Sequence, residues 1–253
     1  MKLTRAEIEA AYNPESDFTI DQARTVKNLF YDYFVAVEAS SKSGDWKLAN
    51  EALAKVKGYQ KFAGAAIYPD DYVITLEILY NNLEIFHYLM IAFLIIGLWL
   101  LVTAFVGIIK PKMNLKMVSK IGFGSLFFFF VLYTLGLIAR WIISGHAPWS
   151  NGYEALVFIG WATLVAGFLV SKNSLLALSA TAILAGITLG VAEISNFDPQ
   201  ITNLVPVLKS YWLTIHVSMI TSSYGFLGLA FLLGFISLIL FISLNSNNAE
   251  RIS

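Results

Sequence analysis

Cysteine is absent from the 253 residues of this chain, and charged residues make up only 13% of them. Without cysteine there is no disulfide, no thiolate metal site and no cysteine nucleophile. Soluble domains are about a quarter charged, so this scarcity of charge excludes an ordinary soluble protein. Apolar residues are abundant instead, at 57% of the chain with a mean hydropathy of +0.68. The composition is that of an integral membrane protein.

Several motifs of soluble enzymes are also missing. The sequence contains no glycine-rich phosphate loop of either common pattern, and its three histidines are too far apart for a zinc helix. No set of serine, histidine and acid can be assembled from loop spacing. No basic patch suits nucleic acid, so we expect no nucleic-acid partner.

The charge that is present lies mostly in the first third of the chain. Residues 1–84 hold 13 of the 17 acidic side chains and 9 of the 17 basic ones. Apolar residues there recur at helical spacing, as in Val26, Leu29, Phe30 and Tyr33. We therefore expect two domains: an extracytoplasmic helical tail over 1–84 that packs as a small hairpin, and a transmembrane domain over 85–253.

Five apolar runs in the second part are long enough to cross a membrane, for which a helix needs about 20 residues. They cover residues 88–109, 121–139, 155–171, 174–192 and 211–244. The predicted fold class is all-α: a polytopic membrane protein with about five transmembrane helices and an N-terminal helical tail.

The positions of lysine and arginine predict the orientation of these spans, because cytoplasmic loops are enriched in both. Six of these residues fall on one side: Lys110, Lys112, Lys116, Lys120, Lys172 and Arg251. Only Arg140 and Lys209 fall on the other. The tail and the loops 140–154 and 195–211 are therefore expected outside, and the loop 110–120 inside.

The predicted outer side also collects the side chains that could bind a ligand. The stretch "SGHAPWSNGYE" (144–154) contains His146, Trp149, Tyr153 and Glu154, and Arg140 lies just before it. Trp149 could be an interfacial anchor, with His146 in a simple turn. Arg140 either anchors the span at the interface or meets a carboxylate, for which Glu154 is one partner.

His216 lies five residues inside the last apolar run. That run would be roughly 51 Å long as a helix, well above the ~30 Å of the hydrocarbon core, so His216 can lie near the outer boundary. Ionisable groups in spans are costly and usually have a partner or a function. His216 is thus either a ligand or hydrogen-bonded to a neighbouring helix, whereas His87, at the start of the first span, is expected to pack at the interface.

Two stretches resemble one known family. "ISGHAPWSNGYEALVFIGW" (142–161) and "LVPVLKSYWLTIHVSMITSSYGFLGLAFLLG" (204–234) are similar to the CcsA/ResC family of system II cytochrome c biogenesis. The tail and "EILYNNLEIF" (77–86) resemble the region just before the CcsA part in fused CcsB–CcsA proteins. The tryptophan-rich W-G-x-x-W-x-W-D segment of the family is absent, so we expect a fragment or the first part of a split gene.

The resemblance implies a function for the chain as part of a cytochrome c haem lyase. Such a lyase delivers haem b, its cargo, to apocytochrome c at the outer face of the bacterial cytoplasmic membrane and forms the thioether bonds. Implied partners are apocytochrome c, the rest of the CcsB–CcsA system with its further spans, thiol-reducing proteins and the lipid bilayer. This chain alone is expected to be inactive.

The family's W-L-x-x-H-V motif makes His216 the implied axial ligand of the haem iron. Trp212, Trp149, Tyr153 and His146 would then form pocket walls, and Arg140 would meet a haem propionate. Two alternatives stay open: a non-catalytic scaffold subunit of the same complex, or half of a transporter. The scarcity of polar groups near the middle of the spans argues against the transporter.

Overall fold

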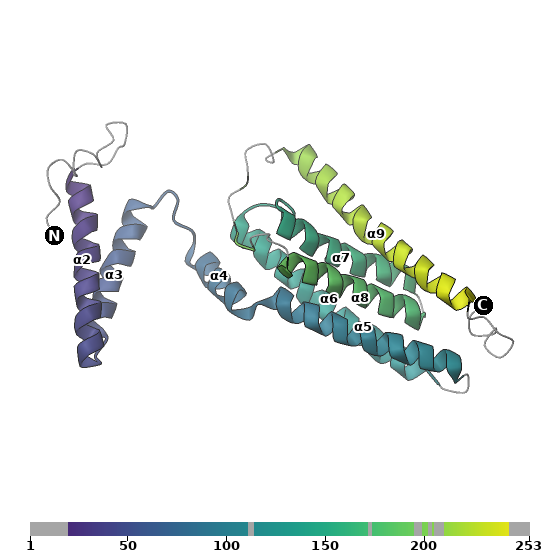
Figure 1. Ribbon diagram of the computed structural model, residues 1–253. Helices are drawn as coiled ribbons and strands as arrows, with labels where there is room; N and C mark the ends of the chain where they lie inside the picture. Colours follow the sequence, from purple (N-terminus) through teal and green to yellow (C-terminus); the bar gives the residue numbers. More distant parts are fainter. Residues whose placement is uncertain are drawn as a thin grey trace. The chain divides into compact units, whose positions relative to one another are not determined.

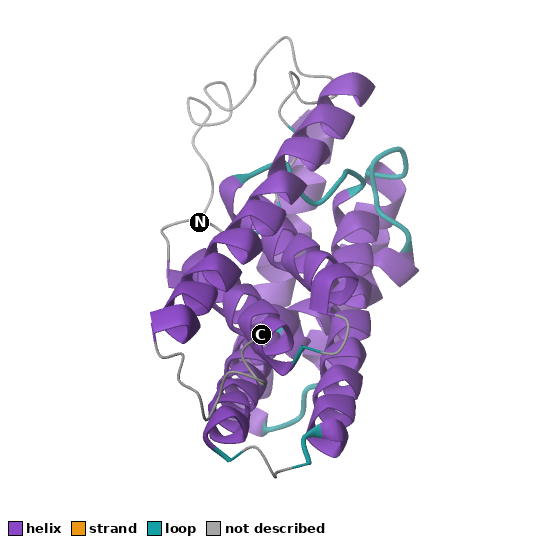
Figure 2. Cartoon of the chain, turned by 90° about the vertical axis from the view of Figure 1, so that its right-hand side faces the viewer, coloured by secondary structure: helices purple, strands orange, loops and turns teal. Residues whose placement is uncertain are grey.

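The structure is a computed structural model that describes residues 20–110, 114–171, 174–194, 199–201, 204 and 210–242. Every regular element in these residues is a helix (Figures 1 and 2). The chain forms two compact units, Met1–Asp70 and Asp71–Ser253. The all-α prediction is therefore confirmed.

The first unit contains two helices, α2 (Ile20–Ser43) and α3 (Lys47–Ala63). They pack against each other as a hairpin, with Ala49 and Val56 of α3 in the contact. Most of their other side chains are exposed, including the aromatic rings of Tyr31 and Phe34. The expected helical hairpin is present.

The second unit begins with two consecutive helices, α4 (Asp71–Leu83) and α5 (Ile85–Ile109). Glu84, between them, has a left-handed backbone with φ of 41°. A side chain disfavours this conformation by about 1–2 kcal/mol. Glu84 itself is exposed, so the buried residues that follow it, Phe86 and Leu89, are the ones that can hold the break in place.

Four further helices complete the second unit: α6 (Lys116–Ser144), α7 (Gly152–Ser171), α8 (Leu175–Ile194) and α9 (Tyr211–Ile242). Together with the α4–α5 segment they give five segments long and apolar enough to cross a membrane. The chain is a multi-pass membrane protein, and each expected span coincides with most of one of these segments.

Helix α8 lies at the centre of the second unit and packs against α5, α7 and α9. Small residues such as Ala180, Ala182 and Gly186 are buried along it and let its neighbours approach closely. By contrast, α9 packs mainly against α7 and buries only Thr221, Gly225, Leu229 and Leu240.

Because successive helices reverse direction, the start of α5, the end of α6, the start of α7, the end of α8 and the start of α9 meet at one end of the second unit (Figure 1). We call this the loop end. It contains every predicted site residue. Of the loop 195–211, residues 195–198, 202–203 and 205–209 lie outside the described residues, as do Lys112, Lys172 and Arg251.

The compact units divide at Asp70, not at residue 84, so α4 belongs with the transmembrane helices. The functional division into 1–84 and 85–253 stays a prediction.

Candidate functional site

Residues at the two ends of the loop between α6 and α7 determine where these helices stop and start. Helix α6 ends at Gly145, whose left-handed backbone (φ 69°) lets its N–H bond the carbonyl of Trp141 at 3.0 Å. Glycine is the residue that adopts this conformation without strain. At the other end, Asn151 caps α7, because its Oδ1 accepts the N–H of Glu154 at 2.8 Å.

Hydrogen bonds inside this loop fix His146. Ser144 Oγ donates to the His146 carbonyl at 2.9 Å, and Ser150 Oγ donates to the Ala147 carbonyl at 2.9 Å. The His146 Nδ1 atom lies 3.0 Å from Ser150 Oγ and 3.1 Å from the Ala147 carbonyl oxygen. Both contacts lie within the loop, so the loop itself holds the ring of His146.

A buried ion pair joins the two helices that flank the loop. Arg140 Nε donates to Glu154 Oε1 at 2.9 Å, and each of the two side chains is 1% exposed. The second oxygen, Glu154 Oε2, accepts the Ser150 N–H at 2.8 Å. Of the alternatives left open for Arg140, the structure shows the pairing with Glu154. One carboxylate thus neutralises the arginine and fixes the loop.

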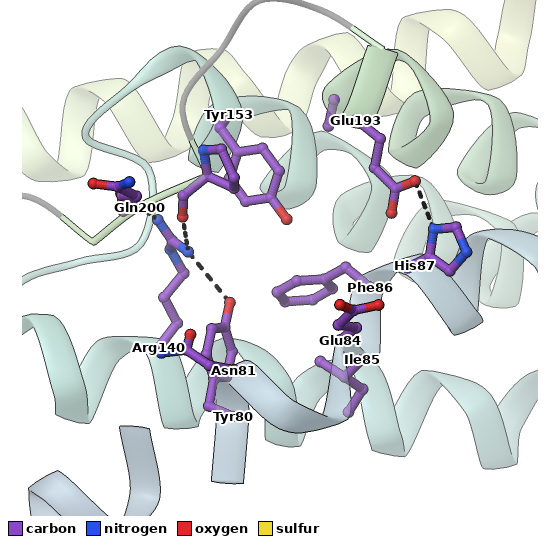
Figure 3. A pocket seen from close by; sticks show the side chains of 12 residues that line it. Tyr80, Asn81, Glu84, Ile85, Phe86, His87, Arg140, Tyr153, Glu193 and Gln200 are labelled. Atoms are coloured by element: carbon purple, nitrogen blue, oxygen red, sulfur yellow. Dashed lines mark hydrogen bonds and ion pairs between the residues drawn. The ribbon is translucent and has the colours of Figure 1, made fainter. Parts of the chain in front are cut away.

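Arg140 also joins segments that are distant in the sequence (Figure 3). Its Nη1 donates to Tyr80 Oη at 3.2 Å and to the Pro199 carbonyl at 3.0 Å, and its Nη2 donates to the Gln200 carbonyl at 3.4 Å. Its Cζ also lies 5.2 Å from the centre of the Tyr153 ring, a cation–π arrangement. Four of the five N–H groups of the guanidinium are therefore used within the chain.

Beside Arg140 lies a cavity of about 380 Å³, here named the Tyr153 cavity (Figure 3). Its lining includes Tyr80, Asn81, Glu84, Phe86, His87, Arg140, Tyr153, Glu193 and Gln200. On one side, His87 Nδ1 lies 2.9 Å from Glu193 Oε2, which joins the start of α5 to the end of α8. Sequence reasoning expected only interface packing for His87 and missed this pair.

A second cavity of about 590 Å³, the Trp149 cavity, lies between the loop and the start of α9. It is lined by Trp141, His146, Trp149, Tyr211, Thr214 and Ser218, among others. Trp149 Nε1 donates to the Thr214 carbonyl at 3.3 Å, and its ring lies 4.6 Å from that of Phe158 and 5.7 Å from that of Trp141. Through Trp149 the loop positions the first turns of α9.

The structure distributes the predicted site residues over three places at the loop end. His146 and Trp149 line the Trp149 cavity, and Arg140 and Tyr153 line the Tyr153 cavity. Trp212 and His216 line neither, and both are exposed on α9. Thr214 faces the loop, and two residues along a helix turn through about 200°, so His216 points to nearly the opposite side.

Nothing in the sequence singled out Tyr80 or Glu193 as partners of site residues. Tyr80 is 60 residues from Arg140, and Glu193 is 106 residues from His87. Each lies at the boundary of an apolar segment, which is the only signal the sequence offers. Among the described residues, no group of three His, Asp or Glu side chains is placed to hold a metal ion.

The fold and this loop define a helical multi-pass membrane protein whose polar side chains converge at one end. A family profile described as cytochrome C assembly protein matches residues 149–252. Protein NrfI of Wolinella succinogenes is 45% identical over 193 residues, which are 76% of this chain and 21% of that protein. The cytochrome c biogenesis protein CcsA of Guillardia theta is 37% identical over 146 residues, or 55% of this chain and 47% of that protein.

The CcsA of the plant Aethionema cordifolium is 39% identical over 94 residues, 35% of this chain and 29% of that protein. This chain belongs to the CcsA/ResC family of cytochrome c biogenesis proteins. It spans about a fifth of NrfI and about half of the Guillardia CcsA.

Proposed function

We propose that this chain handles haem during cytochrome c biogenesis, as part of a system II haem lyase at the outer face of the cytoplasmic membrane. In this proposal His216 is one axial ligand of the haem iron, and haem b is the cargo delivered to apocytochrome c. The other axial ligand would come from the part of the system that carries the tryptophan-rich segment. The thiol-reducing proteins would keep the cysteines of apocytochrome c ready for thioether formation.

The observation that carries this proposal is the position of His216. Its side chain is exposed on α9, and within the described residues it has no hydrogen-bond partner. Trp212 is 77% exposed and lies one helical turn before it, so the two rings share a face of the helix. An accessible imidazole beside a flat aromatic ring suits the iron and the plane of a haem.

The remaining site residues have supporting roles in this proposal. Trp149 holds the start of α9 through Thr214, and the ring of His146 is fixed next to it. Arg140 and Tyr153 brace the loop from behind, and the described residues leave Arg140 one N–H for a carboxylate such as a haem propionate. Protein groups chiefly position the haem, since the addition of a cysteine S–H across a vinyl group needs no further cofactor.

A haem-binding experiment on the purified chain tests the ligand. His216→Gly should reduce the haem that copurifies to about a tenth or less, a loss of about 1.4 kcal/mol or more in binding. Added imidazole should restore the absorbance of the bound haem in this variant, because it replaces the missing ligand. Phe231→Ala is the matched control, since Phe231 is 75% exposed on the same helix and far from the loop end.

Unchanged haem content in His216→Gly, or an equal loss in Phe231→Ala, would exclude His216 as the ligand. A haem-free wild-type chain would favour a scaffold subunit of the same complex.

A further inference from the structure

Most of the lining of the Tyr153 cavity has no role in the proposed haem site, which draws only on Arg140 and Tyr153 there. His216 and Trp212 are absent from this lining, and its side chains come from α4, α5, α6, α7, α8 and the residues after α8. Its volume of about 380 Å³ is at the lower end of the range for small-molecule sites. A ligand there would be small.

The charges around this cavity favour a cation. Glu84 and Glu193 both line it, and the positive charge of Arg140 is matched by the ion pair with Glu154. Four of the N–H groups of Arg140 are already used. His87 contacts only one of the two carboxylate oxygens of Glu193, so that carboxylate keeps lone pairs for another donor.

Tyr153 supplies an independent sign of a ligand. The residue is only 8% exposed, and in the described part of the chain its hydroxyl has no hydrogen-bond partner. Figure 3 shows this hydroxyl directed into the space between Phe86, Glu193 and Tyr80. This hydroxyl opens onto the cavity, where a polar group from outside the chain can reach it and complete its hydrogen bonding.

Aromatic rings form the rest of the wall. Phe86 is 4% exposed, and its ring centre lies 5.4 Å from that of Tyr133 and 6.3 Å from that of Tyr80. Carboxylates combined with aromatic rings are the surroundings in which proteins hold organic ammonium groups. A metal ion fits less well, because no three ligating side chains are grouped among the described residues.

We propose that the Tyr153 cavity binds an alkylammonium group, held by the carboxylates of Glu193 and Glu84, the hydroxyl of Tyr153 and the ring of Phe86. The ammonium donates to these oxygens, while its alkyl part lies against the apolar wall. A soluble amine and an ethanolamine lipid headgroup share this chemistry.

Binding can be measured on the full chain in detergent with n-butylammonium as the probe and neutral n-butanol, which has the same number of non-hydrogen atoms, as the comparison. The ammonium should bind at least about tenfold more tightly, because hydrogen bonds to charged groups are about twice as strong as neutral ones. Equal binding of the two probes would overturn the proposal.

Variants then locate the site. Glu193→Gln, which can keep a contact to His87, should weaken n-butylammonium binding about tenfold, and Tyr153→Phe about threefold. Glu77→Gln removes the same charge from an exposed position on α4 outside the cavity and should bind as the wild type does. Unchanged binding in Glu193→Gln, or an equal loss in Glu77→Gln, would contradict the assignment.

Binding measured in lipid nanodiscs distinguishes a soluble amine from an ethanolamine lipid headgroup as the natural ligand. If a lipid headgroup occupies the cavity, n-butylammonium should bind more weakly in phosphatidylethanolamine than in phosphatidylglycerol. If the ligand is soluble, n-butylammonium should bind with the same affinity in both lipids. Its electrostatic accumulation at the anionic phosphatidylglycerol surface is measured with Glu193→Gln and subtracted. Both outcomes require binding that depends on Glu193, and haem binding by His216 is measured separately.

Discussion

The buried pair of Arg140 and Glu154 is the residue-scale feature on which the loop end depends. Burial of two charges is costly, and the cost is offset only when geometry and further hydrogen bonds are good. Here the carboxylate bonds both Arg140 Nε and the Ser150 N–H, while the arginine bonds Tyr80 and two carbonyl groups. The pairing could be predicted from the sequence because both residues flank one loop. Tyr80 could not, because only the folded chain brings it near.

Removal of one partner from this pair should be more damaging than removal of both. Arg140→Met leaves Glu154 as an uncompensated buried charge and should lower the free energy of unfolding by about 3–5 kcal/mol. The double variant Arg140→Met/Glu154→Leu should recover a large part of that loss. Unfolding in a denaturing detergent, followed by circular dichroism, measures both. A double variant that loses the sum of the two single losses would show that the pair contributes no mutual stabilisation.

At the scale of elements, the apolar runs predicted the spans well because length and hydrophobicity alone decide which segments can cross a membrane. The predicted ends of the helices were less accurate. Helix α6 extends from Lys116 to Ser144, beyond the expected 121–139, because charged residues at the membrane boundary continue the helix. The break at Glu84 was not predicted, since no glycine or proline marks it. The sequence also did not indicate which faces of the helices pack together, because apolar residues lie on all sides of each helix.

The contact between α7 and α9 depends on a close approach at Gly225. A methyl group there would lie 2.9 Å from the backbone nitrogen of Thr163, and a backbone atom cannot yield as a flexible side chain does. Gly225→Ala should therefore cost about 1–3 kcal/mol of unfolding free energy and should loosen α9. The check is the same detergent unfolding, together with increased cleavage near the start of α9 by a protease.

Gly234 offers a matched control on the same helix. Nothing lies within 4 Å of a methyl group at that position. Gly234→Ala should leave stability unchanged or raise it slightly, because alanine favours helix more than glycine does. An equal loss in both variants would mean that helix flexibility, and not packing, explains the glycines of α9.

At the scale of the whole molecule, the sequence predicted a helical tail over 1–84 followed by a membrane part over 85–253, and the chain forms two compact units that divide at Asp70. The prediction grouped six candidate residues around one haem, and in the structure Trp212 and His216 line neither of the two cavities that the loop residues line. Sequence position alone places residues at one end of a span. It does not give the direction in which each side chain points, which depends on the packing of α9 against α7.

The predicted sidedness can be tested directly because the chain has no cysteine. Ser174 directly precedes α8 and Gln200 follows it in the next loop, and both are exposed. In intact cells, Gln200→Cys should react with a membrane-impermeant maleimide, and Ser174→Cys should react only after the cells are opened. The unaltered chain supplies a background free of label. Labelling of Ser174→Cys in intact cells would reverse the proposed orientation.

The ion pair between Arg140 and Glu154 also has a consequence for biosynthesis. The two residues are 14 positions apart, so a ribosome adds Glu154 about one to three seconds after Arg140. Tyr80 has been made earlier, and the carbonyl groups of Pro199 and Gln200 follow later. The hairpin of α6 and α7 thus carries its own counterion when it enters the bilayer. The ion pair needs no residue of α8 or α9, so it can form before those helices have packed, and the loop can take its shape in time to receive α9.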